Sequence, residues 1–338
     1  MNSDNPFISV IIPVYNGGGY IEECLRALGS SLYRSFETIV VNDASTDNTA
    51  EICRGFGAAV IGLERQSGPA AARNEGAKRA AGEILLFVDA DVVVTENTLG
   101  QFADIFIGDP GISAAFGSYD DSPKAPDFIS QYRNLLHHFV HQRSYGDADT
   151  FWAGCGAVRR KVFSELGGFD GDKYPAPSIE DIELGYRMRQ KGYRITLDKG
   201  IEVKHLKHWH WRSMIRTDIF NRALPWSKLI IETGMMPSDM NLSVSDRMST
   251  VLAGLLSLIL LAIILGLLRP YGSGITFVLV IAALAIVAAL LTLNRGLYGF
   301  FLRKRGLRFT LLAIPMHFLY YLYCGASFAV CWIENRIP

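Results

Sequence analysis

The chain has 338 residues, and its 33 lysine and arginine residues balance 33 aspartate and glutamate residues. A net charge of zero gives no electrostatic case for binding nucleic acid, and the length exceeds that of a typical single domain. The five cysteines are odd in number and unpaired in spacing, which is typical of a reducing compartment and argues against a disulfide framework or a zinc site.

The first part of the chain alternates apolar runs with helical patterns. Residues 8–12 and 38–41 are continuous apolar runs, and residues 21–28 between them place apolar side chains at helical spacing. An alanine-rich helix at 69–81 then leads into the most apolar run, 84–88. This alternation predicts an α/β domain with a mostly parallel mixed sheet flanked by helices, and such sheets bind ligands at the carboxyl ends of their strands.

Polar residues follow the predicted strands. Tyr15 and Asn16 come after the first strand, Asp43 after the second, and Asp89 and Asp91 after the run at 84–88. Two carboxylates one residue apart at a strand end reach the rim of the sheet, where Mg²⁺ or Mn²⁺ could hold a diphosphate. Acidic pairs in such turns are also often only solvated, so the pair alone leaves both interpretations open.

The first strand-to-helix turn argues against one common ligand of such sheets. It reads PVYNGGG over residues 13–19, which lacks the Gly-x-Gly-x-x-Gly spacing that lets a backbone approach a dinucleotide pyrophosphate. We therefore expect no dinucleotide-dependent dehydrogenase. Gly17, Gly18 and Gly19 are interpreted as a flexible entry to the first helix.

Five ordered blocks carry a family resemblance. They read SVIIPVYN, IVVNDASTDNT, GPAAARNEGAKRAAGEILLFVDAD, WAGCGAVRRKVFSELGGFD and EDIELGYRMRQKGYRI. Together they resemble the successive motifs of a family 2 glycosyltransferase of the GT-A fold, over roughly residues 7–235. The resemblance implies that the domain transfers a sugar, with inversion, from a nucleotide donor, usually a UDP-sugar or GDP-sugar, to an acceptor hydroxyl.

The resemblance assigns donor-binding roles to five residues. Pro13 and Tyr15 would form a platform for the base, because an aromatic ring offers a stacking face. Asp43 would recognise the nucleobase, and a simple turn residue is the alternative interpretation. Arg73 would neutralise phosphate or bridge to Asp89, and Asp89 would contact the ribose.

A divalent cation, Mg²⁺ or Mn²⁺, is the implied cofactor. Asp91 would bind it and Asp89 would contact it through water, because such ions prefer oxygen ligands and keep positions open for phosphate. His205 lies in EVKHLKHWHW, where some relatives contribute a further metal ligand. A histidine in such a run is equally well explained as a surface residue.

The acceptor hydroxyl loses a proton as it attacks, so a carboxylate within hydrogen-bond reach is needed. The segment EDIE at 180–183 opens a helical pattern, where acids also complement the helix dipole. The resemblance makes Asp181 the catalytic base and places Glu180 beside the acceptor. Trp152 and Gly154 would line the acceptor cleft, the tryptophan as a stacking surface and the glycine by allowing close approach.

Apolar residues concentrate in the last third of the chain. Residues 248–268 and 274–293 are uncharged and long enough to cross a bilayer, so we expect residues 236–338 to form an all-α transmembrane region. A third stretch, 309–332, is less uniform. We interpret it as a span too, and the alternative is a helix that lies in the interface or packs on the other two.

Basic residues orient this region. The loop between the first two spans carries Arg269 alone. The expected loop between the second and third spans carries Arg295, Arg303, Lys304, Arg305 and Arg308. This second loop should stay cytoplasmic, and an even number of crossings puts residues 1–235 on the same face. We therefore expect an integral membrane protein in contact with lipid, with a cytoplasmic catalytic domain.

The segment at 216–226 limits the kind of transferase. It reads RTDIFNRALPW, which does not match the Gln-x-x-Arg-Trp element of processive polysaccharide synthases. We expect transfer of a single sugar to a hydroxyl of a lipid-linked or membrane-proximal glycan, as in the biosynthesis of cell-envelope polysaccharide. A polyprenyl-phosphate sugar transferase, whose phosphate acceptor needs little base catalysis, and a non-enzymatic membrane scaffold are the alternatives.

Overall fold

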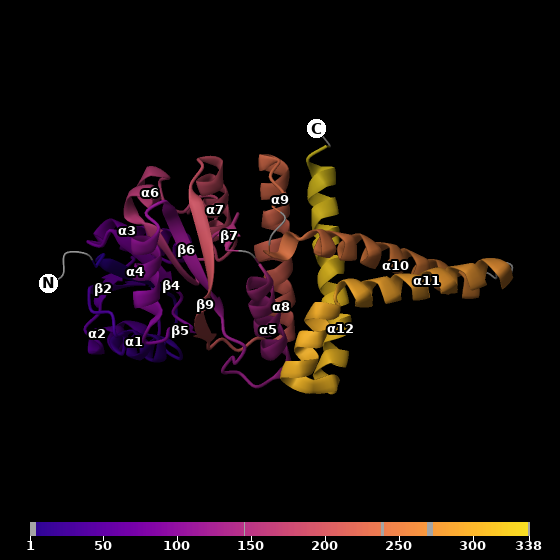
Figure 1. The fold of residues 1–338 in the computed structure, drawn as a ribbon, viewed down its shortest axis with the longest axis horizontal. Helices are drawn as coiled ribbons and strands as arrows, with labels where there is room; N and C mark the ends of the chain where they lie inside the picture. Colours follow the sequence, from indigo (N-terminus) through magenta and orange to yellow (C-terminus); the bar gives the residue numbers. More distant parts are fainter. Residues whose placement is uncertain (1–4, 145, 238–239, 269–272, 337–338) are drawn as a thin grey trace. The chain divides into compact units, whose positions relative to one another are not determined.

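The chain forms two compact units, Met1–Trp211 and Arg212–Pro338 (Figure 1). The computed structural model describes residues 5–144, 146–237, 240–268 and 273–336. The sequence predicts a boundary at residue 235, whereas the two units divide after Trp211, because the residues in between pack with the C-terminal helices. The Tyr323 hydroxyl donates a hydrogen bond to Asp218, and the Cys331 thiol contacts the Leu224 carbonyl.

A mixed β-sheet lies at the centre of the N-terminal unit. Its strands are β1 (Ile8–Val14), β2 (Phe36–Asn42), β3 (Ala59–Gly62), β4 (Ile84–Val88), β5 (Val92–Val93), β6 (Ile112–Tyr119), β7 (Asp147–Ala148), β8 (Cys155–Arg159) and β9 (Arg194–His205). The strand order is β3-β2-β1-β4-β8-β6-β9-β5, with β7 paired to β9. β1 runs parallel to β2 and β4, whereas β8 lies antiparallel between β4 and β6.

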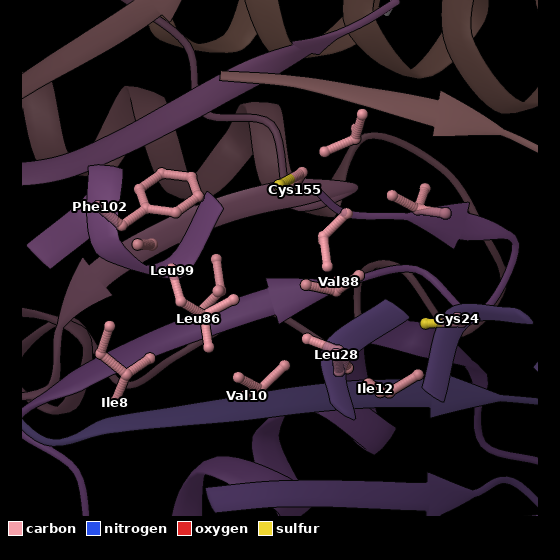
Figure 2. Packing of buried hydrophobic residues seen from close by; sticks show 14 of the residues in the cluster. Ile8, Val10, Ile12, Cys24, Leu28, Leu86, Val88, Leu99, Phe102 and Cys155 are labelled. Atoms are coloured by element: carbon pink, nitrogen blue, oxygen red, sulfur yellow. The ribbon is translucent and has the colours of Figure 1, made fainter. Parts of the chain in front are cut away.

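Helices flank this sheet, as the alternating pattern predicted. They are α1 (Ile21–Gly29), α2 (Thr49–Gly55), α3 (Gly68–Arg79), α4 (Thr98–Gly108), α5 (Phe128–Arg143), α6 (Arg160–Glu165) and α7 (Glu180–Gln190). β1 is buried along its whole length because its two faces meet different helices. Val10 and Ile12 belong to a core that includes Leu28 of α1 (Figure 2), whereas a Cβ on Gly76 of α3 would lie 2.5 Å from Ile11.

The parallel strands bring three polar segments to one edge of the sheet. β1, β2 and β4 all run in the same direction, so their carboxyl ends meet there. The register pairs Val14 with Asn42, and the Asp43 amide donates to the Val14 carbonyl at 2.8 Å. The polar residues that follow these strands therefore share one rim.

The C-terminal unit is helical. Its elements are η1, a π-helix (Thr217–Ala223), α9 (Leu224–Thr233), η2, a 3₁₀ turn (Met240–Leu242), α10 (Val244–Leu268), α11 (Ser273–Leu293) and α12 (Arg295–Glu334), and α8 (Trp211–Arg216) straddles the division between the units. By length and composition, α10, α11 and α12 could each cross a membrane. The sequence-predicted stretches 248–268, 274–293 and 309–332 lie within these three helices.

The prediction of a loop between the second and third spans is wrong. The structure continues α12 through that segment as helix, interrupted at Gly306 by a left-handed backbone conformation with φ of 80°. Leu297, Phe300 and Phe301 are buried at helical spacing, so packing of these side chains forms a helix where the charges suggested a loop. The basic residues therefore lie on helical segments around a sharp turn.

Candidate active site

The acidic pair lies where β4 ends. The Asp89 amide donates to the Gly154 carbonyl at 3.1 Å, which holds the strand end against the segment leading into β8. Directly after Asp91, the chain pairs with β9, and the register sets Val92 opposite His205. Asp91 Oδ2 and His205 Nε2 consequently lie 3.6 Å apart. The structure thus brings together the two residues that the resemblance named as metal ligands.

The Asp91–His205 pair is suited to an ion that also binds substrate oxygen. Burial raises the pKa of Asp91, but interaction with His205 outweighs it, so the pKa lies below its usual value and the carboxylate is an anion. Among the described residues, no group of three histidine, cysteine, aspartate or glutamate side chains could hold a metal on its own. An aspartate and a histidine fit Mg²⁺ or Mn²⁺ that takes its remaining ligands from a diphosphate and water.

Arg73 forms a buried bridge between two acids. Its guanidinium donates to Asp89 Oδ1 at 2.7 Å and to Glu180 Oε1 at 2.8 Å, and it lies over the Phe169 ring. Burial lowers the pKa of Arg73, but the two carboxylates raise it above its usual value, so the side chain stays charged. The bridge to Asp89 was among the expectations, whereas the bond to Glu180 was not.

Glu180 itself is engaged on both carboxylate oxygens. Oε1 accepts from Arg73, and Oε2 accepts from the backbone amide of Ser178 at 3.0 Å. Its side chain is only 6% exposed, compared with 33% for Asp89. These contacts hold Arg73 in place, and the expected position of Glu180 beside the acceptor stays a prediction.

Asp181 occupies the first turn of α7, as the sequence predicted. Its Oδ2 accepts from the Ala153 amide at 3.0 Å and its Oδ1 from the Ile182 amide at 2.9 Å. Burial, and then the negative charge of Glu180, raise the pKa of Asp181 to about 6. A carboxylate with this pKa is a stronger base than an ordinary aspartate and is still ionised at neutral pH.

Trp152 lies directly against the backbone of its own loop. A Cβ on Gly154 would lie 2.5 Å from the indole ring, so only glycine permits this packing. The indole also meets the rings of Tyr119 at 4.8 Å and His137 at 5.3 Å between centroids. Tyr119 in turn stacks on His205 at 4.3 Å with an interplanar angle of 19°. A continuous aromatic cluster therefore reaches from Trp152 to the candidate metal ligand.

The expected nucleobase residues lie at the ends of β1 and β2. Tyr15 is 45% exposed immediately after β1, and Pro13 is buried within that strand. Asp43 is buried and accepts from the backbone amides of Ser67 at 2.7 Å and Gly68 at 2.9 Å, at the start of α3. Asp43 therefore anchors the N-terminus of α3 and leaves the second lone pair of each oxygen for a ligand.

The three glycines after β1 were interpreted as a flexible entry to α1, and two of them are held instead. The Gly17 amide donates to the Thr49 hydroxyl at 2.9 Å, and the Gly18 amide donates to Asp47 Oδ2 at 3.0 Å. A Cβ on Gly17 would lie 2.3 Å from a methyl group of Val14. Close approach of side chains, and not flexibility, explains Gly17 and Gly18.

Comparison with known families agrees with this geometry. The model of the family described as "Glycosyl transferase family 2" matches residues 9–167, which include β1, the Asp89 and Asp91 pair and the Trp152 loop. The N-terminal unit belongs to the family 2 glycosyltransferases.

Two relatives of this glycosyltransferase unit illustrate the similarity. Glycosyltransferase AglE of Haloferax volcanii is 45% identical over 208 residues, which are 58% of this chain and 66% of that protein. Glycosyltransferase GlyG of Streptococcus pneumoniae serotype 4 is 36% identical over 128 residues, which are 34% of this chain and 40% of that protein. The chain thus spans less than two thirds of the length of either relative.

A solved structure supports the fold of the glycosyltransferase unit. The mannosyltransferase PcManGT from Pyrobaculum calidifontis, in complex with GDP-Man and Mn²⁺, superposes with a TM-score of 0.52 at 20% identity. The match covers 98% of this chain and 88% of the other. At this identity the comparison establishes the GT-A fold, a mixed sheet flanked by helices, and the sequence expectation of that fold is confirmed.

Two features of the glycosyltransferase site escaped the sequence analysis. Glu180 was recognised as an acid but not as the partner of Arg73, because the two are 107 positions apart and no periodic pattern links them. Tyr119 and His137 were not recognised at all. They lie at the end of β6 and within α5, outside the five blocks, and only the folded chain brings them to Trp152.

Proposed function

We propose that this chain is a membrane-anchored, metal-dependent, inverting glycosyltransferase that moves one sugar from a UDP-sugar or GDP-sugar to a hydroxyl of a lipid-linked or membrane-proximal glycan. The observation that carries the proposal is the ionic bridge from Asp89 through Arg73 to Glu180, with Asp181 as the next residue. This bridge joins Asp89, the proposed donor-binding acid at the end of β4, to α7, the helix that carries Asp181 with its raised pKa.

The donor binds along the rim of the sheet. The exposed Tyr15 ring offers a stacking face for the base, and the remaining lone pairs of Asp43 accept hydrogen bonds from it. The partly exposed Asp89 carboxylate accepts from the ribose hydroxyls. Burial raises the pKa of Asp89, and Arg73 opposes that rise while its hydrogen bond fixes the orientation of the carboxylate.

Asp91 and His205 would hold Mg²⁺ or Mn²⁺ beside the donor diphosphate. A divalent ion bound there supplies Lewis-acid stabilisation of the charge on the departing diphosphate, so no protein general acid is needed. The Mn²⁺ and GDP-Man in PcManGT support this assignment. The stack of Tyr119 on His205 holds the imidazole plane in a fixed orientation.

Asp181 acts as the general base. The two backbone amides that donate to its oxygens fix the carboxylate, and its pKa of about 6 matches the proton affinity needed near neutral pH. It removes the proton of the acceptor hydroxyl as that oxygen attacks the anomeric carbon opposite the departing diphosphate. Trp152, one residue before the Ala153 amide, gives the acceptor sugar a stacking surface.

The membrane region anchors the enzyme to the bilayer where its acceptor lies. α11, and α10 beyond its polar first turns, are predominantly apolar, which suits contact with lipid. The basic residues after α11 favour a cytoplasmic position for that end, and the catalytic unit then faces the cytoplasm, where nucleotide sugars are available.

A donor screen tests the reaction class. Purified full-length protein would be given a panel of UDP-, GDP- and dTDP-sugars, with and without Mn²⁺, and release of nucleoside diphosphate measured. We expect release from one donor class, and we expect chelation of the metal to abolish it. Failure of every donor to bind or to be hydrolysed with Mn²⁺ present would favour the non-enzymatic scaffold.

The catalytic base is tested with Asp181→Asn, matched by Asp104→Asn on the exposed side of α4. General-base catalysis contributes about 10²–10⁴-fold, so transfer to a hydroxyl acceptor should fall by that factor in the first variant and stay unchanged in the second. Full activity of Asp181→Asn would instead favour a phosphate acceptor, because a phosphate oxygen needs little base catalysis.

A further inference from the structure

Buried polar contacts mark the base of the hairpin formed by α10 and α11. Asn294, which follows α11, donates from Nδ2 to the Ser249 hydroxyl of α10 at 3.0 Å. The Tyr321 hydroxyl of α12 lies 2.8 Å from Asn294 Oδ1 and 3.1 Å from Asp246 Oδ1. Tyr321 of α12 therefore lies at the level where α10 begins and α11 ends.

The part of α12 that follows Tyr321 is too short to cross a membrane alongside the hairpin. From Tyr321 to Glu334 the helix extends by about 20 Å at 1.5 Å per residue, whereas a hydrocarbon core is about 30 Å thick. Figure 1 shows α12 running across the base of the α10–α11 hairpin and not along it. The far half of the hairpin accordingly exposes large apolar side chains such as Leu258, Ile264 and Phe277.

The first part of α12 is a second, shorter hairpin. Gly306, with a φ of 80°, reverses the chain between two helical arms. The arms pack on each other through the rings of Phe301 and Phe309, 5.5 Å apart, and the Tyr298 hydroxyl lies 3.3 Å from His317 Nδ1. The segment RKRGLR at 303–308 therefore forms the tip of a helical hairpin.

This tip, which we call the basic tip, combines cationic and apolar side chains. Its cationic residues are Arg303, Lys304, Arg305 and Arg308. Three leucines beside them are strongly exposed: Leu302 at 48%, Leu307 at 63% and Leu311 at 58%. The sequence from 295 to 333 contains no acidic residue, so this segment carries a net positive charge. Exposed leucines next to arginine and lysine match a surface that is anionic at the headgroups and apolar just beneath them.

We propose that α12 does not cross the bilayer but lies along its interface, across the base of a two-helix membrane anchor, with the basic tip on anionic phospholipid headgroups. The exposed leucines enter the acyl region, and the cationic groups meet lipid phosphates. At the other end of α12, Arg336 lies over the Trp332 ring, an aromatic and basic pair suited to the same interface. The catalytic unit and the end of α12 then lie on one face of the membrane.

The first test is topological and needs no enzymatic activity. The full chain would carry one affinity tag before Met1 and another after Pro338, and sealed membrane vesicles of defined orientation would be treated with protease. Two crossings expose both tags on the same face, which is the expected result. Digestion of the N-terminal tag from one face and of the C-terminal tag from the other would overturn the proposal, because α12 would then be a third span.

The second test concerns the lipid. Full-length protein would be placed in nanodiscs of phosphatidylcholine alone or with one-third phosphatidylglycerol, and hydrogen exchange followed over residues 299–312. We expect the anionic lipid to slow exchange there by about tenfold or more. Equal exchange in both lipids would overturn the assignment of anionic headgroups as the partner.

A matched pair of variants separates the basic tip from charge in general. The triple variant Arg303→Gln, Lys304→Gln and Arg308→Gln should lose the protection by anionic lipid. The control triple variant Arg54→Gln, Arg79→Gln and Lys161→Gln removes the same number of charges from exposed helical positions of the other unit and should keep the protection. Loss of protection in both triples would show that net charge, and not the basic tip, attracts the lipid.

Discussion

Each unit of the molecule contains a cluster of polar side chains. The two clusters differ in how much of their hydrogen-bonding capacity is used within the protein. In the N-terminal unit, Arg73 bridges Asp89 and Glu180, and the Asp89 side chain remains 33% exposed. In the C-terminal unit, Asp246, Asn294 and Tyr321 are all less than 10% exposed, and the Tyr321 hydroxyl bonds to both of the other side chains.

This difference separates a cluster that can bind a ligand from one that only stabilises the packing of helices. A buried cation that orients a partly exposed acid retains capacity for a ligand, and such arrangements cluster where substrates bind. A closed set of side-chain hydrogen bonds between helices contributes to packing and leaves nothing for a ligand. The first cluster should therefore respond to substitution in both stability and catalysis, and the second in stability alone.

The largest effect is expected for Arg73→Met. This change leaves the buried Glu180 carboxylate and the partly exposed Asp89 carboxylate without their cation, at a cost of about 3–5 kcal/mol. We expect the Tm of the purified protein to fall by roughly 6–20 °C and sugar transfer to be lost. Arg26→Met is the control, because its ion pair with Glu22 is largely exposed and contributes little. An unchanged Tm for Arg73→Met would remove the distinction between the clusters.

The metal side of the site is tested by His205→Ala. Removing a ligand should raise the Mn²⁺ concentration for half-maximal binding by at least about tenfold, as measured by calorimetry in the presence of nucleoside diphosphate. His208→Ala is the control, since that imidazole pairs with Asp127 and its side chain is 47% exposed. Equal Mn²⁺ affinity in the two variants would favour the interpretation of His205 as a residue of the aromatic cluster only.

The pH dependence of catalysis tests Asp181 without a substitution. The base acts as the anion and its pKa is about 6, so kcat/KM should fall about tenfold per unit below pH 6 and level off above about pH 7. Because folding raises this pKa, the stabilising contribution of protonated Asp181 is complete below its unfolded pKa and is lost as the pH rises through 6. A profile without an acidic limb near pH 6 would contradict the assignment of the base.

The sequence predicted the parts of the molecule that depend on local pattern. Burial of β1 and β4 on both faces follows from their almost entirely apolar sequences, and the acids of the α7 first turn follow from helical spacing. The bond between Arg73 and Glu180 could not be predicted, because neither residue's neighbours specify a partner 107 positions away. The helix before Gly306 was not predicted, because its basic residues suggested a loop and the helical spacing of its apolar residues was a weaker signal.

The smallest effect is expected for Tyr321→Phe, which removes the hydroxyl shared between Asp246 and Asn294. Interhelical hydrogen bonds in membrane proteins contribute about 0.6 kcal/mol on average, so the Tm should fall by only a few degrees. The kcat and KM for donor should stay at the wild-type values, because no ligand contacts this cluster if it only fastens the helices. Tyr20→Phe, the same chemical change in the other unit, is the control. A loss of transfer activity in Tyr321→Phe with an unchanged Tm would show that the second cluster is also a functional site.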